Sequence, residues 1–225
     1  MKQDKVSAHY QGRKGEAYFS YQNQGNLHRG RINARKFAPY VRPADTVLDF
    51  GCGNGSLLYH LNCRRRIGLE INPAAIAAAR KLDIEVHEDL ETITPCSVDL
   101  VISNHALEHV LAPVQTLQLL REKLVPDGRL VFCLPIDDWR TQQEPDPADI
   151  NHHLYTWTPL LFGNLLTEAG FAVERAWVYH HAWPPRLWRQ LDERLPVWLF
   201  DWICNLTARR YKRRQLMAVA QNRTA

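Results

Sequence analysis

The sequence predicts an α/β protein built on a parallel β-sheet, and two observations lead to this prediction. From residue 46 onward, short apolar segments rich in β-branched residues alternate with longer helix-like segments, as strands and helices do in such sheets. A glycine-rich turn, GCGNG, directly follows the first apolar segment. Ligands of parallel sheets bind at the carboxyl ends of the strands, so this turn marks the expected binding edge.

Seven segments have the composition of strands, and they are residues 46–50, 65–71, 84–88, 98–104, 129–135, 171–180 and 214–221. Four segments between them have helical features, and they are residues 56–61, 73–80, 113–128 and 157–170. Proline opens the second of these helices, where the missing N–H is tolerated. A Pro-Asp-Gly turn is expected to close the third helix at residue 128.

Charge and composition divide the chain into four parts. Residues 1–43 carry nine Lys and Arg against two Asp and Glu, and we expect a basic, helical N-terminal cap. Residues 44–180 form the ligand-binding domain, residues 181–213 a tryptophan-rich helical excursion, and residues 214–225 the last strand and a tail. The five cysteines include no C-x-x-C pair, which indicates reduced thiols and a cytoplasmic protein.

The tryptophan-rich excursion has two interpretations. Its apolar residues recur at helical spacing, and they are Leu195, Trp198, Leu199, Trp202, Ile203 and Leu206. The preferred interpretation is a cap that buries this stripe against the sheet or against a second copy of the chain in a homodimer. Alternatively, residues 183–214, which end in the basic run RRYKRR, lie on an anionic membrane surface as a peripheral contact at the inner face.

The glycine-rich turn in VLDFGCGNG (47–55) indicates a particular ligand. A dinucleotide pattern would place its third glycine at position 56, where Ser56 stands. Asp49 precedes the first glycine by two residues and suits a positively charged group. Glu70 closes the second strand, where a carboxylate accepts hydrogen bonds from ribose hydroxyls. An ammonium group and a ribose occur together in S-adenosylmethionine, which we expect to be the cofactor.

In these motifs the chain resembles the class I S-adenosylmethionine-dependent methyltransferases, of the type 11 and type 23 groups. The motifs that carry the resemblance are VLDFGCGNG, GLEINP, HEDL, VDLVISNHALEHV and LREKLVPDGRLVFCLP, in the family's order. The resemblance covers residues 45–180 and the last strand. It implies a seven-stranded Rossmann-like sheet with an antiparallel last strand, and a methyl-transfer activity.

The same resemblance implies which residues bind the cofactor. They are Asp49, Gly51, Cys52, Gly53, Glu70, Ile71, Asp89, Leu90 and Asn104. A run before the first motif, LHRGRINARKF, is similar to one in the ubiquinone-biosynthesis O-methyltransferases. It implies that Arg31 or Arg35 holds the cofactor carboxylate through a forked hydrogen bond, and we select Arg31.

The stretch NHALEHV contains His105, Glu108 and His109 at the spacing of the inverted zinc peptidases. It begins at the end of an apolar strand rather than on a helix, which argues against a peptidase. The ubiquinone-biosynthesis O-methyltransferases carry Glu-x-x-Glu-His at this place and use it for a divalent metal. Because two imidazoles suit magnesium poorly, we expect no metal ion here.

Methyl transfer to a hydroxyl benefits from a nearby base, and histidine has a suitable pKa. We select His105, His109 and His153 as candidate bases because they follow predicted strands on the ligand side. The basic ends favour an anionic small-molecule, glycan or lipid-linked acceptor. Two alternatives stay open: a tRNA methyltransferase, disfavoured because NHAL stands where an N-P-P-[YF] motif would, and a non-catalytic cofactor-binding partner protein.

Overall fold

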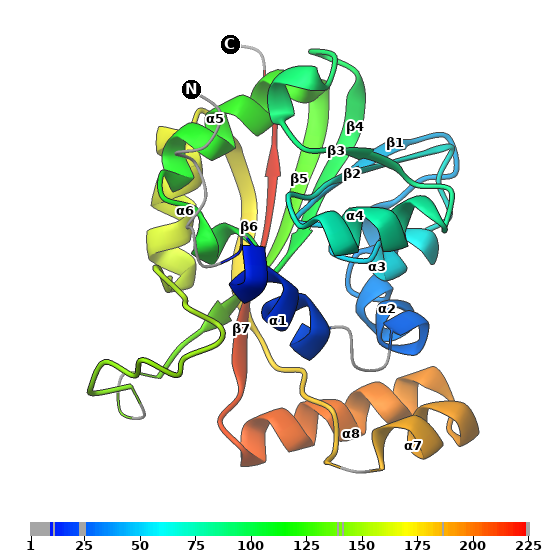
Figure 1. The fold of residues 1–225 in the computed structure, drawn as a ribbon, viewed down its shortest axis with the longest axis vertical. Helices are drawn as coiled ribbons and strands as arrows, with labels where there is room; N and C mark the ends of the chain where they lie inside the picture. Colours follow the sequence, from blue (N-terminus) through cyan, green and yellow to red (C-terminus); the bar gives the residue numbers. More distant parts are fainter. Residues whose placement is uncertain are drawn as a thin grey trace.

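The computed structural model describes residues 10, 12–22, 26–138, 140, 142–185 and 187–223, and its core is one seven-stranded sheet (Figure 1). The strands are β1 (Thr46–Phe50), β2 (Arg65–Leu69), β3 (Glu85–His87), β4 (Val98–Asn104), β5 (Leu124–Ile136), β6 (Ala172–Tyr179) and β7 (Arg214–Gln221). Their spatial order is β3-β2-β1-β4-β5-β7-β6, and β7 runs antiparallel to both neighbours. The predicted fold class is confirmed.

The helices are α1 (Gly12–Gln22), α2 (Asn26–Ala34), α3 (Ser56–Tyr59), α4 (Pro73–Arg80), α5 (Pro113–Lys123), α6 (Pro159–Glu168), α7 (Trp188–Arg194) and α8 (Val197–Arg210). Short 3-10 helices are η2 (Ala38–Tyr40), η3 (Leu90–Thr92) and η4 (Leu107–His109). The helix expected over 113–128 ends earlier, at Lys123. From Leu124 the chain is extended and pairs with Val98, so strand pairing replaces the predicted last helical turn.

The two faces of the sheet carry different helices, because successive strand residues point to opposite sides. On one face, Leu48 and Phe132 pack in a buried cluster with residues of α5 and α6. On the other face, Val47 and Val131 pack in a second cluster with residues of α3. The central strands are therefore covered on both sides, and the binding edge is left open at the ends of the strands.

The excursion between β6 and β7 forms α7 and α8, which lie together at one end of the molecule in Figure 1. Its buried contacts come from Phe200 and Cys204, which pack with Ile32 of α2. Asp192 of α7 is buried and accepts a hydrogen bond from Arg31 of α2 in a short contact. The excursion is thus anchored to α2 by an apolar contact and by an ion pair.

The predicted apolar stripe of the excursion is not the face that α8 buries within this chain. Trp198 is 71% exposed and Trp202 is 57% exposed, whereas Phe200 and Cys204 are fully buried. The buried face follows residues at i and i+4, nearly half a turn away from the tryptophans. In the described part of the chain, no helix has the length and apolar character needed to cross a membrane.

Candidate active site

A cavity of about 1610 Å³ opens at the carboxyl ends of the parallel strands. Its wall includes the turn after β1, Glu70 after β2, Asn104 at the end of β4 and Asp137 after β5. Gln215, from the start of the antiparallel β7, also lines it. Of the predicted residues, Asp49, Gly51, Cys52, Gly53, Glu70, Ile71, Asn104, His105, His109 and His153 line this cavity. The topology therefore brings residues from distant parts of the sequence to one place.

The glycines of the turn adopt left-handed backbone conformations that favour residues without a side chain. Gly51 has a φ of 74°, and a Cβ there would lie 2.4 Å from the Cβ of Ala106. Gly53 has a φ of 54°, and no described atom lies within 4 Å of an added Cβ. The first glycine therefore allows close packing of two turns, and the second keeps part of the cavity clear.

Asp49 is the clearest indication of a cationic ligand. Its side chain comes from the buried strand β1, the residue is 2% exposed, and its Oδ1 has no hydrogen-bond partner among the described residues. Burial raises the pKa of this carboxyl well above its ordinary value, and the nearby Glu70 raises it further. A buried carboxylate of this kind needs a partner, and a ligand ammonium group would supply one.

Glu70 is held in place by backbone groups around the turn. Its Oε2 accepts a hydrogen bond from the Gly53 N–H at 2.9 Å, and its Oε1 accepts from the N–H groups of Ile71 and Asn72 at 2.8 and 2.9 Å. Burial nevertheless raises its pKa. The carboxylate is oriented at the cavity wall, where a ribose could share its lone pairs. Asp49, Glu70 and the glycine turn together fit the methionyl and ribose groups of S-adenosylmethionine.

Three predicted cofactor residues are not among the described residues that line the cavity. Asp89 accepts a hydrogen bond from the Glu91 N–H and caps η3, and Leu90 is buried in the core. Arg31 pairs with Asp192 of α7 instead of facing the cavity. Arg31 does not line the cavity because the buried carboxylate of Asp192, in the excursion, attracts its guanidinium group. The sequence of α2 alone does not indicate where this carboxylate lies.

Lys36 takes a central position that the sequence did not indicate. Its ammonium group donates to Asn104 Oδ1 and to Gln215 Oε1, each at 3.0 Å. The residue is buried and lines the cavity between the end of β4 and the start of β7. It therefore places a positive charge beside Asn104, the residue expected to lie near the transferred methyl group.

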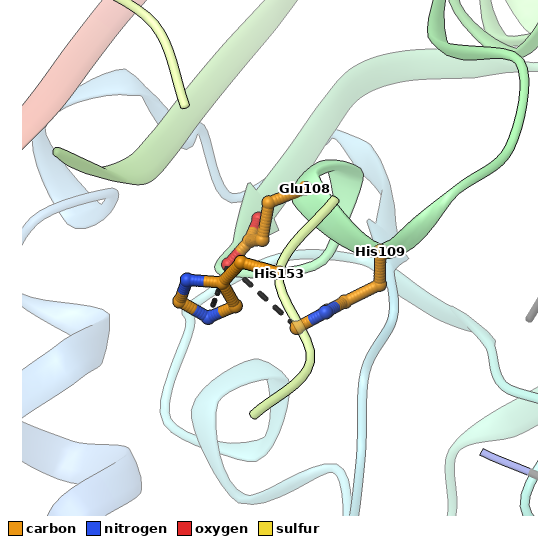
Figure 2. A group of neighbouring side chains, drawn as sticks. All are labelled: Glu108, His109 and His153. Atoms are coloured by element: carbon orange, nitrogen blue, oxygen red, sulfur yellow. Dashed lines mark ion pairs between the residues drawn. The ribbon is translucent and has the colours of Figure 1, made fainter. Parts of the chain in front are cut away.

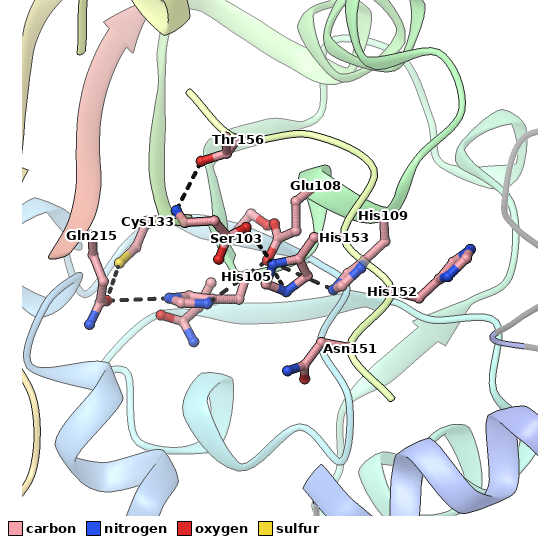
Figure 3. A network of polar contacts seen from close by, with 12 residues as sticks. Ser103, His105, Glu108, His109, Cys133, Asn151, His152, His153, Thr156 and Gln215 are labelled. Atoms are coloured by element: carbon pink, nitrogen blue, oxygen red, sulfur yellow. Dashed lines mark hydrogen bonds and ion pairs between the residues drawn. The ribbon is translucent and has the colours of Figure 1, made fainter. Parts of the chain in front are cut away.

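The three candidate bases surround one buried carboxyl group, that of Glu108 (Figure 3). Its Oε1 lies 3.8 Å from His105 Nδ1, 3.8 Å from His109 Nε2 and 4.0 Å from His153 Nε2. His153 Nδ1 also lies 2.9 Å from Asp137 Oδ2. The H-x-x-E-H stretch thus consists of η4 and the two residues before it, and it lies in the cavity wall. His153 reaches the same place from the loop after β5.

The electrostatics of this cluster follow from burial. Burial raises the pKa of Glu108 to about 8. Burial and the nearby Lys36 charge lower the pKa of His105. The pKa of His153 is raised overall: burial lowers it, but the hydrogen bond to Asp137 and the charge of Glu108 outweigh that effect. Near neutral pH these shifts favour a neutral carboxyl on Glu108 and a neutral imidazole on His105, and they favour the charged form of His153.

Two further residues of the cluster, Tyr10 and Asp137, are not among those predicted from the sequence. The Tyr10 hydroxyl lies 2.6 Å from His109 Nδ1, and the Asp137 carboxylate orients His153. Tyr10 comes from the N-terminal segment, for which the sequence indicates no position in space. Asp137 follows a strand on the ligand side, as the predicted histidines do, and this position was the available signal.

The fold and the site together define a Rossmann-like protein that binds S-adenosylmethionine. Residues 21–176 match the model of the methyltransferase domain family, and this match covers more than half of the chain. The chain therefore belongs to the methyltransferase family, and its cofactor is S-adenosylmethionine.

Curated relatives match shorter segments. The mitochondrial ubiquinone biosynthesis O-methyltransferase of Schizosaccharomyces pombe is 35% identical over 102 residues, which is 38% of this chain and 36% of that protein. A ribosomal protein L11 methyltransferase of Thermosipho africanus is 29% identical over 117 residues, covering 48% of this chain and 44% of that protein. These matches therefore span less than half the length of the relatives.

Solved structures share the fold at low identity. One is a chain of the complex between the Haloferax volcanii Trm112 methyltransferase activator and a methyltransferase, with a TM-score of 0.66, 19% identity, and coverage of 93% of this chain and 97% of that chain. Another is the Haemonchus contortus phosphoethanolamine N-methyltransferase 2 in complex with phosphomonomethylethanolamine and S-adenosylhomocysteine. Its TM-score is 0.64 at 12% identity, over 96% of this chain and 59% of that chain.

Proposed function

We propose that this methyltransferase methylates a hydroxyl group of a small, anionic acceptor that enters the cavity beside Asn104. The observation that carries the proposal is the cluster of His105, His109 and His153 around Glu108 in the cavity wall. A hydroxyl oxygen must lose its proton as it is methylated, and a cluster of imidazoles provides acceptors for that proton. The O-methyltransferase among the curated relatives supports this choice of acceptor atom.

In the proposed reaction the protein supplies position and a proton acceptor. Bound S-adenosylmethionine provides a methyl group on a sulfonium, which is activated for displacement as the carbon–sulfur bond breaks and a carbon–oxygen bond forms. Asp49 and Glu70 hold the donor at the strand ends. The histidine cluster takes up the hydroxyl proton on a ring nitrogen, and the walls of the cavity keep the reacting atoms in line.

An anionic acceptor fits a group of cations that line the cavity. Lys36 is buried in the wall, and the exposed residues Lys212, Arg213 and Arg214 line the cavity from the end of the excursion. We expect a carboxylate, phosphate or sulfate group of the acceptor to bind between these cations, with its hydroxyl directed toward the histidines.

A transfer assay with a labelled methyl group tests the acceptor atom. The protein is incubated with S-adenosylmethionine and, in separate reactions, with acidic phenols, acidic sugars, aromatic amines or unmodified tRNA. We expect label on oxygen in an acidic hydroxyl compound, and a loss of roughly 100-fold or more when His105, His109 and His153 are all replaced by alanine. Label only on nitrogen or on tRNA would contradict the proposal. Cofactor binding without transfer to any acceptor would favour the non-catalytic alternative.

The exposed face of α8 supports the proposal that the acceptor is lipid-linked and is met at an anionic membrane surface. Trp198, Trp202 and Leu206 are exposed on this helix, and the basic residues 209–214 follow directly. The adjoining Thr207 and Tyr211 line the cavity, so the apolar face lies next to its opening. An apolar face bordered by cations is typical of helices that lie in the interface of anionic membranes.

Replacing both Trp198 and Trp202 with alanine should weaken binding to anionic vesicles by roughly tenfold for each tryptophan, because each loses apolar area that the membrane would cover. Co-sedimentation with vesicles of phosphatidylglycerol and phosphatidylcholine measures the effect. The matched control replaces Leu160 and Leu161 of α6, which are also exposed and lie in a segment, residues 150–170, without Lys or Arg. Absence of vesicle binding, together with a tryptophan-dependent dimer in sedimentation analysis, would show that α8 forms a homodimer interface instead.

A further inference from the structure

The ring of His153 is bonded to a carboxylate at one nitrogen and lines the cavity with the other. Its Nδ1 lies 2.9 Å from Asp137 Oδ2, and because a carboxylate accepts hydrogen bonds, this nitrogen carries the hydrogen. In the neutral ring, Nε2 therefore has the lone pair. This nitrogen lies 4.0 Å from Glu108 Oε1 (Figure 2), which is too long for a hydrogen bond, and no other described group is hydrogen bonded to it. His153 thus presents a proton acceptor in the cavity wall.

The loop that carries His153 is held in place beside the ring. The Leu154 N–H donates to the Glu108 carbonyl at 2.9 Å, which joins the loop to η4. The Asp137 N–H donates to Thr156 Oγ1 at 3.0 Å, which joins the loop to the end of β5. Asp137 and His153 are therefore connected through the backbone as well as through their side chains. A catalytic group held in this way keeps its position as substrate binds.

The neighbouring His152 differs from His153 in its surroundings. It has a φ of 49°, a left-handed conformation that is uncommon for a residue with a side chain. Its side chain is not among the described residues that line the cavity, and in Figure 3 it lies away from the cluster that contains His153. Strained conformations of this kind are retained where the surrounding structure fixes them, often at functional sites. The backbone thus directs one histidine of the pair into the cavity.

The other two candidate bases are less suited to receive the proton. Both ring nitrogens of His109 lie beside tyrosine hydroxyls, with Nδ1 2.6 Å from Tyr10 and Nε2 3.5 Å from Tyr18. Burial and the charge of Lys36 lower the pKa of His105 to about 3, so this imidazole holds a proton only weakly at neutral pH. Of the three rings, that of His153 combines a carboxylate partner with an accessible lone pair.

We propose that His153 is the general base that takes the proton of the acceptor hydroxyl, and that Asp137 is a positioning residue that fixes its ring and stabilises its protonated form. This inference rests on the proposed function. The hydroxyl oxygen bonds to the methyl carbon, the electron pair of the carbon–sulfur bond passes to sulfur, and the hydroxyl proton moves to His153 Nε2. The imidazolium is then paired with the Asp137 carboxylate. The His153 side chain is 19% exposed, so water can remove the proton afterwards.

The charges around His153 determine the pH at which it can act. The ionisable groups that face its ring or its backbone are Asp137 after β5, Glu108 and His109 in η4, His105 before η4, Asp149 in the same loop, and Tyr10 from the N-terminal segment. Burial lowers the pKa of His153, but the hydrogen bond to Asp137 and the charges of the nearby carboxylates raise it more. Because only the neutral ring accepts a proton, the rate should rise as the pH rises through this pKa.

NMR titration of the histidine ring protons tests the pairing in the free protein, without an acceptor. The signal of His153 is the one that His153→Ala removes, and the other histidine signals report whether this variant keeps its fold. We expect the pKa of His153 to lie above the ordinary value of histidine in the wild type and to be lower in Asp137→Asn. His152→Ala is the control and should leave this pKa close to that of the wild type. A pKa of His153 at or below the ordinary value, or unchanged in Asp137→Asn, overturns the pairing.

The pH dependence of methyl transfer tests the base itself, with the acidic hydroxyl compound that takes up label as the acceptor. We expect His153→Ala and His153→Gln to lower kcat by about 100-fold or more with little change in KM, and to abolish the rise of the rate with pH. Added imidazole should restore part of the activity of His153→Ala. Asp137→Asn should lower kcat by roughly tenfold or more and move the rise to lower pH, whereas His152→Ala should retain the wild-type profile.

The outcomes separate the base from the proposed function. If both His153 variants keep the kcat and the pH profile of the wild type, His153 is not the base, and the proposed methylation of a hydroxyl still stands. If no hydroxyl compound takes up label, the proposed function fails and the role of His153 as a base fails with it. The NMR titration reports the pairing of His153 with Asp137 in either case, because it requires no methyl transfer.

Discussion

Replacing Asp49 with asparagine should weaken the binding of S-adenosylhomocysteine by roughly 30- to 1000-fold, the effect of about 2 to 4 kcal/mol expected when one partner of a buried charge pair is removed. The carboxylate is buried, and its Oδ1 lacks a partner among the described residues until a ligand provides an ammonium group. Asparagine keeps the shape of the side chain and removes its charge. Calorimetric titration with the product measures the effect.

Asp49→Asn should raise the stability of the ligand-free protein while it lowers the affinity for the ligand. A residue with a structural role would instead lose stability when it is replaced. Burial and Glu70 raise the pKa of Asp49 in the folded state, so its contribution to stability is lost as the pH rises through that pKa. The gain in Tm for Asp49→Asn should therefore be larger at pH 8 than at pH 5. Asp45→Asn is the control, since Asp45 is partly exposed and its carboxylate accepts a hydrogen bond from the Arg42 N–H in the turn before β1. A destabilised Asp49→Asn protein would contradict this account of Asp49.

Replacing Gly53 with alanine should weaken cofactor binding by at least tenfold at a modest cost in stability. The φ of 54° costs an alanine about 1 to 2 kcal/mol, and the new methyl group would project into the cavity. Gly12→Ala is a matched control. Gly12 has a φ of 55°, and no described atom lies within 4 Å of an added Cβ there either. Titration with S-adenosylhomocysteine and chemical unfolding of both variants measure the two effects.

We expect Gly53→Ala and Gly12→Ala to lose the same amount of stability. Only Gly53→Ala should lose affinity for S-adenosylhomocysteine. If both variants bind the product as the wild type does, the turn does not face the cofactor. If Gly53→Ala is far less stable than Gly12→Ala, the turn has a structural role, because strain alone is the same at the two positions.

The sheet could be predicted because its determinants are local. The strand over 98–104 and the helix over 73–80 have the predicted bounds, since apolar runs and a proline at a helix opening act within a few residues. The helix expected to reach residue 128 ends at Lys123, because pairing of Leu124 with Val98 depends on a residue far along the chain. Local patterns cannot report such pairing.

The same distinction between local and long-range determinants applies to the site. The glycine turn, Asp49 and Glu70 could be selected from the sequence because all of them lie at or beside the ends of predicted strands. Arg31 was assigned to the cofactor, but its partner is Asp192, which lies 161 positions away in the chain. The joining of His153 to Glu108 likewise depends on how two loops meet at the end of the sheet. Residues brought together by tertiary structure alone leave no periodic signal in the sequence.

A crystal structure of the protein with S-adenosylhomocysteine tests the central claim most directly. We predict that the ligand ammonium group contacts Asp49 Oδ1, that the ribose hydroxyls contact the Glu70 carboxylate, and that the sulfur faces Asn104. A ligand bound elsewhere in the cavity, with Asp49 Oδ1 still lacking a partner, would contradict the account of this protein as a methyltransferase that holds its cofactor at the ends of β1, β2 and β4.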